Sequence, residues 1–297
     1  MGILDLLIFP SIIFWIFLSF FYEWIDRKIV ARLQKRVGPY FAGKSGFLQP
    51  FADFMKLLSK EDITPKAADY LFTIASILAL FIPLFSLSFI SFFRPFLSFE
   101  GDILILLYLF IFETLLLQII GFSSFSRFGV VGSGRLILQA LVFEISLILA
   151  GITPIILTGS FNLSQISKSG WLIFSAPLAF IVFIFSFLGE LQLMPFDIPV
   201  AKQEIVAGWE TELSGKKFAF VKLGKSLEFL FSCCLIVSLF LGGGNFIEFM
   251  IKITIVVFLF SVLRSIFARL RIDQTLEIAW KILIPLALLQ LLIITIL

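Results

Sequence analysis

Histidine is absent from this 297-residue chain, and cysteine occurs only as the adjacent pair Cys233 and Cys234. Neighbouring cysteines cannot readily bridge to each other, so a structural disulfide is not expected. Without histidine, and with so few cysteines, the chain lacks the usual ligands of a haem or an iron–sulfur cluster. It also lacks a Walker A motif and a complete dinucleotide fingerprint. We therefore expect this chain alone to bind no metal and no cofactor, and to carry no electrons itself.

Charge is also scarce, since only 14% of the residues are charged while 60% are hydrophobic. This composition is typical of an all-α, polytopic integral membrane protein and excludes an ordinary soluble domain. The net charge of +3 gives no indication of nucleic acid binding. One membrane domain over residues 1–297 is expected. It has about eight apolar runs long enough to cross a bilayer, at 3–24, 70–93, 102–122, 136–158, 171–191, 226–242, 246–266 and 277–296.

The basic residues indicate how the chain is oriented. Twenty of the 23 Lys and Arg residues fall on one side of these spans, and only Arg94, Lys168 and Lys252 fall on the other. Positive charge favours the cytoplasmic side, so both termini are expected outside. The predicted cytoplasmic loops cover about 25–69, 123–135, 192–225 and 265–276.

The third of these loops belongs to a polar segment, residues 189–215, which we call the island. It carries five carboxylates within an otherwise apolar chain: Glu190, Asp197, Glu204, Glu210 and Glu212. Pro195 and Pro199 indicate a turn, and a short helix over 199–207 is expected. An acidic loop can simply be solvated. The apolar residues between these acids favour a loop packed against other parts of the molecule.

The other three loops differ in character. After Pro50, apolar residues recur at helical spacing between charged ones, which predicts an amphipathic helix at the membrane interface. A plain lipid anchor is the alternative. The second loop is rich in Ser and Gly, and its Arg127 and Arg135 are placed to face the acids of the island. The last loop carries Arg269, Arg271 and Asp273.

Among the acids of the predicted spans we single out three, together with a fourth, Glu190, at the edge of a span. The three are Glu113, Glu144 and Glu228. Ionisable residues in hydrocarbon are costly and mark functional positions by default, and such carboxyls can exchange protons near neutral pH. We interpret the four as a proton relay. The alternative is that each is a paired acid with a structural role.

The island contains the motif Pro195-Phe196-Asp197-Ile198-Pro199, followed by Glu204-Ile205-Val206-Ala207-Gly208 and Ser214-Gly215. Further motifs occur in order along the whole chain: Asp26-Arg27-Lys28 to Gly38-Pro39, Leu48-Gln49-Pro50, Arg127 to Arg135, Glu144, Arg264 to Gln274, and Trp280 to Pro285. Together these motifs resemble the H-subunit family of NADH–quinone oxidoreductase, the bacterial counterpart of mitochondrial complex I subunit 1. The related subunit of membrane-bound hydrogenases belongs to the same group.

The resemblance implies a subunit in a prokaryotic cytoplasmic membrane that anchors a hydrophilic arm and walls a chamber where a quinone is reduced. The quinone would lie at the interface with partner subunits, and the iron–sulfur clusters would lie in those partners. The implied partners are the hydrogenase-like and terminal iron–sulfur subunits of the arm, small membrane subunits and antiporter-like membrane subunits. The implied proton relay comprises Glu144, Glu190 and Glu204, to which we add Glu113 and Glu228. The implied chamber and arm junction comprise Arg27, Arg36, Gln49, Asp53, Pro195, Phe196, Asp197, Lys202, Glu210 and Glu212. Loop-stabilising roles are expected for Arg127, Arg135, Arg269, Arg271 and Asp273.

The sequence departs from the quinone-type pattern in its acids. Val200 and Lys202 stand where two further acids are usual, and Lys225 stands where another is usual, with Glu228 one turn later. These departures favour an alternative in which the chain serves a membrane-bound hydrogenase or a ferredoxin-linked complex without quinone. A third hypothesis, a stand-alone secondary transporter, predicts inverted repeats that the sequence does not show.

Overall fold

The computed structural model describes residues 12–90 and 99–296, and every regular element within them is a helix. Parts of the first two predicted spans, residues 3–11 and 91–93, and Arg94 lie outside the described residues. The α-helices are α2 (Ile12–Leu33), α3 (Gln49–Ser59), α4 (Tyr70–Leu87), α5 (Asp102–Ser123), α6 (Arg127–Thr158), α7 (Leu163–Lys168), α8 (Pro177–Glu190), α9 (Lys202–Ile205), α10 (Gly215–Phe240), α11 (Phe246–Ile266), α12 (Ile272–Ile278) and α13 (Ile284–Ile296).

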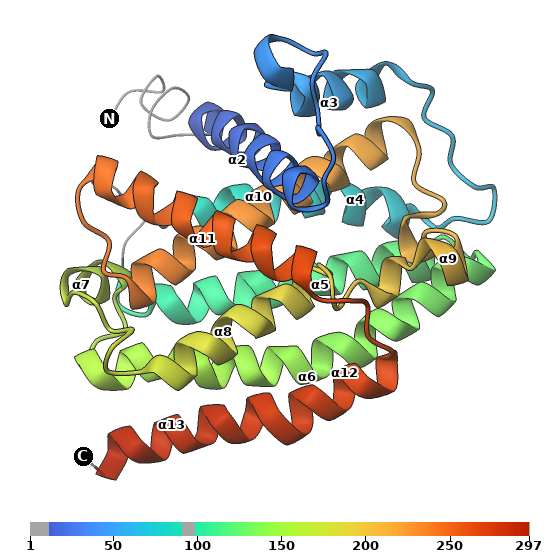
Figure 1. Ribbon diagram of the computed structural model, residues 1–297. Helices are drawn as coiled ribbons and strands as arrows, with labels where there is room; N and C mark the ends of the chain where they lie inside the picture. The colour runs from blue at the N-terminus through green and yellow to red at the C-terminus, as the bar shows by residue number, and fades with distance from the viewer. Residues whose placement is uncertain (1–11, 91–98, 297) are drawn as a thin grey trace.

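The expected all-α membrane fold is confirmed. Helices α4, α5, α6, α10, α11 and the continuous run Ile272–Ile296 are long and apolar enough to cross a bilayer, and α8 is a shorter apolar helix. Helix α10 lies at the centre and contacts α2, α4, α8 and α11. It crosses α4 closely because residue 224 is glycine: a Cβ there would lie 2.1 Å from the carbonyl oxygen of Ala79. Helix α13 packs on α6 and α8 at the edge of the bundle (Figure 1).

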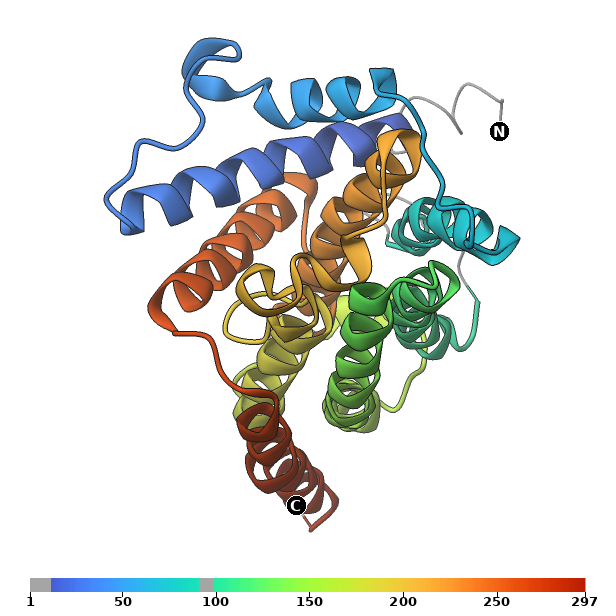
Figure 2. The same cartoon turned by 90° about the vertical axis from the view of Figure 1, so that its right-hand side faces the viewer.

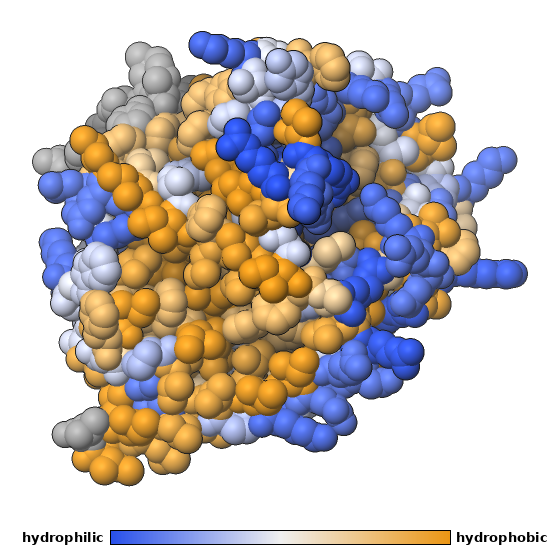
Figure 3. Space-filling model, in the orientation of Figure 1, coloured by the Kyte–Doolittle hydropathy of each residue, from blue (hydrophilic) through white to orange (hydrophobic). Residues whose placement is uncertain are grey.

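Helix α2 runs across the others, as the view along the bundle shows (Figure 2). The amphipathic helix predicted after Pro50 is α3, which packs alongside α2. Its Phe51 and Phe54 rings both contact Phe20 of α2 at centroid distances of 6.0 and 5.8 Å. Hydrophilic residues gather at the end of the bundle that carries the island, whereas apolar residues cover α11 and α13 (Figure 3). The described beginning of α2 and the end of α13 lie at the opposite end (Figure 1).

Two predicted loops are shorter than the sequence indicated. Helix α6 begins at Arg127, so most of the predicted loop 123–135 is helical. The Ser126 hydroxyl caps this helix by accepting a hydrogen bond from the N–H of Gly129 at 3.0 Å. Likewise α10 begins at Gly215, eleven residues before the predicted span, and its first turn is tied to the first loop by the ion pair between Lys217 and Asp62 at 2.7 Å. The short helix expected over 199–207 is broken into a 3-10 turn, Ile198–Val200, and the single turn α9.

Between α12 and α13 the chain forms a π-helical turn, Ala279–Leu283. Pro285 lies two residues after this turn, and proline has no N–H for the regular α-helical hydrogen bond and crowds the preceding turn. A wider turn at this point accommodates the ring without breaking the helix.

Candidate functional site

A cavity of about 490 Å³ opens beside the island, and we call it the island cavity. Its wall combines the end of α2, the island, α10, α11 and the segment that follows α11. The lining residues are Val30, Gln34, Arg36, Gln192, Leu193, Met194, Asp197, Val200, Lys202, Gln203, Lys225, Arg264 and Arg269. Five of these are cations and one is an acid, so the cavity is positively charged.

The island is held in place by ties to helices far away in the sequence. The Arg269 guanidinium bonds both carboxylate oxygens of Asp197, one of them at 2.7 Å from Nε, and this raises the pKa of Arg269. Next to it, the N–H of Leu270 donates to the carbonyl of Pro195 at 3.2 Å. Beneath, the buried amide of Gln139 on α6 donates to the carbonyls of Gly189 and Phe196. These ties fix the floor and one wall of the cavity.

The indole of Trp209 anchors the far end of the island. It is fully buried against α5 and α6, where Gly121 and Gly132 leave room for it. A Cβ on Gly132 would lie 2.6 Å from the backbone nitrogen of Trp209. The indole N–H donates to the side-chain oxygen of Gln192 at 3.0 Å, and the ammonium of Lys225 lies 4.6 Å from the ring centroid. Trp209 thus links α6, the island and α10.

A second cavity of about 270 Å³, the helix cavity, adjoins the first. The two share Gln192, Leu193, Lys225 and Arg264. The helix cavity is further lined by Glu23, Asp26, Arg27, Leu191, Lys222, Ser226, Glu228 and Phe229. Of the shared cations, Lys225 pairs with Glu210 at 2.9 Å and Arg264 pairs with Asp26 at 2.6 Å. A polar space therefore extends from the loop surface to Glu228, a buried acid of α10.

Four of the predicted relay acids are brought together by α5, α6, α8 and α10. Glu190, which we expected at an edge, is buried, and neither of its carboxylate oxygens has a hydrogen-bond partner among the described residues. Its charge interacts with those of Glu144 and Glu228, and Glu228 in turn interacts with Glu113. Glu144 also accepts a hydrogen bond from Thr114 at 3.3 Å. The four acids form one electrostatic cluster, which we call the acid cluster.

Glu204 lies apart from the acid cluster. Its half-exposed carboxylate pairs with Arg135 of α6 at 2.5 Å, so the predicted contact between the second loop and the island forms at Arg135. Arg127 is exposed and has no ion pair within the described stretches. Arg271 and Asp273 are also exposed and unpaired there. The backbone N–H of Arg271 donates to the side chain of Gln274 at the start of α12.

The predicted chamber residues of α2 and α3 form a small network. Arg27 lines the helix cavity and donates to Asp53 at 2.8 Å and to Glu23, while Gln49 donates to Asp53 at 2.9 Å. Partial burial opposes ionisation of Asp53, but these hydrogen bonds and the charge of Lys222 outweigh it and hold its pKa below the usual value. The network fixes α3 to the side of the cavities.

The remaining predicted residues divide between lining and support. Arg36, Asp197 and Lys202 line the island cavity. Phe196 is buried and contacts the Phe143 ring at 4.8 Å, so it supports the floor. Pro195 supplies the carbonyl that Leu270 bonds, and Glu210 holds Lys225. Glu212 is half-buried at the end of the island and forms no ion pair in the described part of the chain.

Sequence reasoning missed several residues of the helix cavity, chiefly Gln192, Glu23 and Asp26. Gln192 is a lone amide directly after an apolar helix, and it joins both cavities to Trp209. Glu23 and Asp26 are two acids one turn apart at the end of the first apolar run, which places them on one face of a helix. That spacing, next to Arg27, was the available signal.

Comparison with known proteins gives a consistent result. The family described as NADH dehydrogenase matches residues 6–295. The H subunit of NADH-quinone oxidoreductase from Bacillus cytotoxicus is 38% identical over an alignment of 281 residues that covers 89% of this chain and 84% of that protein. The corresponding H subunits from Bacillus mycoides and Bacillus thuringiensis are each 37% identical over the same shares.

Proposed function

Because the chain belongs to the NADH dehydrogenase family, with relatives that are H subunits of NADH-quinone oxidoreductase, we propose that it walls the acceptor chamber of a complex-I-type pump. It is an integral membrane subunit of a multisubunit oxidoreductase. In the proposed assembly the hydrophilic arm covers the island and its terminal iron–sulfur cluster delivers electrons to a quinone held in the island cavity. Small and antiporter-like membrane subunits complete the pump.

One observation carries this proposal: the two cavities connect the loop surface to the acid cluster through shared residues. Electrons that arrive at an acceptor bring negative charge, which the cations around the island cavity stabilise. Lys225 lies at the junction, since it lines both cavities and its charge acts on Glu113 and Glu228. A change of charge in the island cavity therefore alters, through Lys225, the electrostatic interactions of Glu113 and Glu228 inside the membrane. We propose that protons pass from this cluster towards the neighbouring membrane subunits.

The orientation follows from the same proposal. The charged end of the bundle, with the island and the Arg27 network, faces the cytoplasm, where the arm docks. The beginning of α2 and the end of α13 then face outside. Helix α3 lies along the interface and, with the crossing helix α2, borders the path by which a lipid-soluble acceptor reaches the island cavity.

The proposal is tested by replacing Glu228 with Gln in the intact complex. The amide keeps the shape of the side chain but cannot ionise, so we expect acceptor-coupled proton translocation into vesicles to fall at least tenfold while the complex still assembles. Glu277→Gln is the matched control, because Glu277 is an exposed acid paired with Lys281 at 3.1 Å. Unchanged proton translocation in Glu228→Gln would remove the acid cluster from the mechanism.

One observation favours a second candidate function. Val200 and Lys202, which stand where acids are usual in the quinone-type pattern, both line the island cavity. A chamber so altered suits a membrane-bound hydrogenase or ferredoxin-linked complex that reduces a different acceptor. Metal and lipid analysis of the gently purified complex separates the two. Iron with co-purifying quinone supports the quinone pump, whereas nickel at about one atom per complex supports the hydrogenase.

A further inference from the structure

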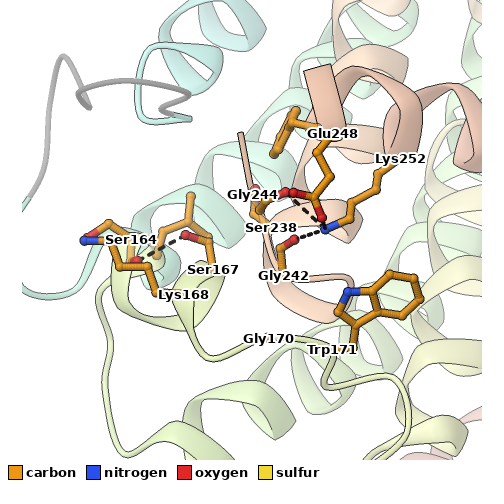
Figure 4. A pocket seen from close by; sticks show the side chains of 13 residues that line it. Ser164, Ser167, Lys168, Gly170, Trp171, Ser238, Gly242, Gly244, Glu248 and Lys252 are labelled. Atoms are coloured by element: carbon orange, nitrogen blue, oxygen red, sulfur yellow. Dashed lines mark hydrogen bonds and ion pairs between the residues drawn. The ribbon is translucent and has the colours of Figure 1, made fainter. Parts of the chain in front are cut away.

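A third cavity of about 520 Å³ lies at the end of the bundle opposite the island, where α7, α10 and α11 meet (Figures 1 and 4). Nothing in the proposed pump uses it. Its wall is formed by Leu163, Ser164, Ser167, Lys168, Gly170, Trp171, Ser238, Gly242, Gly243, Gly244, Glu248, Phe249 and Lys252. Since one water occupies about 30 Å³, the space equals roughly seventeen waters and can hold a polar group of about ten heavy atoms.

Lys252 forms a fixed positive centre in this wall. It is almost completely buried, and its ammonium donates to the carbonyls of Gly242 and Gly243 and pairs with Glu248 at 3.0 Å. An ammonium has three protons, so Lys252 has none left for a ligand. Figure 4 shows Lys252 and Glu248 converging on the Gly242 turn, with Trp171 beside them; the ammonium lies 5.4 Å from the Trp171 centroid.

Lys168 and Glu248 are the charged groups that remain available to a ligand. Lys168, at the end of α7, forms no ion pair within the described residues, so two cations and one acid leave the cavity with a net charge of +1. The Glu248 side chain is 52% exposed despite its pair with Lys252. The lining therefore combines an exposed lysine that has no ion pair among the described residues with a half-exposed carboxylate.

The surface beside the cavity is apolar and aromatic. Trp171 stacks on Phe174 with centroids 6.1 Å apart, and both rings are exposed. Exposed tryptophan at the end of membrane-spanning helices is typical of the level of the lipid headgroups. Acyl chains entering the bilayer from the cavity would pass along these rings.

We propose that this cavity binds the headgroup of a phospholipid that carries an amine, such as phosphatidylethanolamine. The phosphodiester pairs with Lys168, while the headgroup ammonium lies against Glu248. The lipid then joins α7 to the turn between α10 and α11 at the end of the bundle remote from the island. This proposal does not depend on the proposed redox function.

The test is native mass spectrometry of the intact, delipidated complex titrated with phosphatidylethanolamine. Lys168→Gln removes the phosphate partner without touching the buried Lys252, and we expect it to weaken lipid binding roughly tenfold. Lys281→Gln is the control, because it removes an exposed lysine at a distant π-helical turn and should leave binding unchanged. Glu248→Gln should weaken the binding of phosphatidylethanolamine more than that of phosphatidylglycerol, because phosphatidylglycerol has no amine.

Equal binding by Lys168→Gln and the unchanged complex would overturn the proposal. Inorganic phosphate is titrated alone as a further arm. If phosphate binding depends on Lys168 and the lipid does not compete with phosphate, the cavity binds free anions and the proposal that its ligand is a lipid is wrong. A chemical cross-link from Lys168 to a neighbouring subunit in the delipidated complex, unaffected by added lipid, would show a protein occupant and also overturn it.

Discussion

The ion pair between Asp197 and Arg269 permits a quantitative test of how the island is held. Both side chains are largely buried, with 17% and 25% of their surface exposed, and they form two charge-assisted hydrogen bonds. Each such bond contributes about 1.5–3 kcal/mol where it is desolvated. Allowing for the remaining exposure, we expect the pair to stabilise the closed island by about 2 kcal/mol in total.

Trypsin cleavage after the exposed Lys202 measures this free energy, because the island must open locally before a protease can bind it. Loss of about 2 kcal/mol raises the open population roughly 30-fold, so cleavage should accelerate by that factor in Asp197→Asn and in Arg269→Gln. The double variant should be cleaved no faster than either single variant, because the second change removes nothing further. If the two effects simply multiply, the residues act independently and the reasoning fails.

Three further predictions follow from the geometry of the island and its surroundings. Gly132→Ala forces a Cβ against the backbone of Trp209 and should lower the unfolding free energy by about 1–3 kcal/mol. Gly134→Ala adds a Cβ in open space on the same helix and should leave the unfolding free energy unchanged or raise it slightly. Thermal denaturation of the complex compares the two variants. Lys202→Glu reverses a charge in the island cavity and should change the KM for a quinone acceptor several-fold; identical kinetics with every acceptor would exclude this side chain from the chamber. The Asp53 carboxyl has a lowered pKa, so its ionised form holds α3 fully above about pH 4, and this stabilisation is lost as the pH falls through the native pKa. The rate at which a cysteine placed on α3 is labelled should therefore rise below the native pKa. Asp53→Asn should abolish this dependence of the labelling rate on pH.

The membrane fold was predictable because hydrophobic length is a local property of the sequence. The apolar runs, the amphipathic helix after Pro50 and the packed character of the island all follow from composition and periodicity. Loop boundaries were harder. The segment containing Gly129 and Gly132 has the composition of a loop, yet it forms the first turns of α6 because the small residues allow α5 and Trp209 to approach closely. That reason lies in tertiary packing, which a local pattern does not contain.

The candidate site was predictable in its residue types and less so in its partnerships. The acids within the spans were identified from the cost of burying them, and the structure places four of them together. The pairing of Asp26 with Arg264 joins residues 238 positions apart, and that of Lys217 with Asp62 joins residues 155 apart. Single-sequence patterns extend over one or two helical turns, so they identify the charged residues but cannot assign their partners.

The π-helical turn at Ala279–Leu283 amounts to one extra residue inside the run Ile272–Ile296. Each residue of an α-helix advances the direction of the side chains by about 100°. Deleting Ile282 would therefore leave a continuous α-helix in which α13 presents nearly the same face to α6 and α8, because the wider turn holds the extra residue. A single-residue insertion or deletion in the regular α-helical part of this run would instead turn the side chains that follow it by about 100°, and a different side of α13 would then meet the bundle even where composition and hydropathy stay the same.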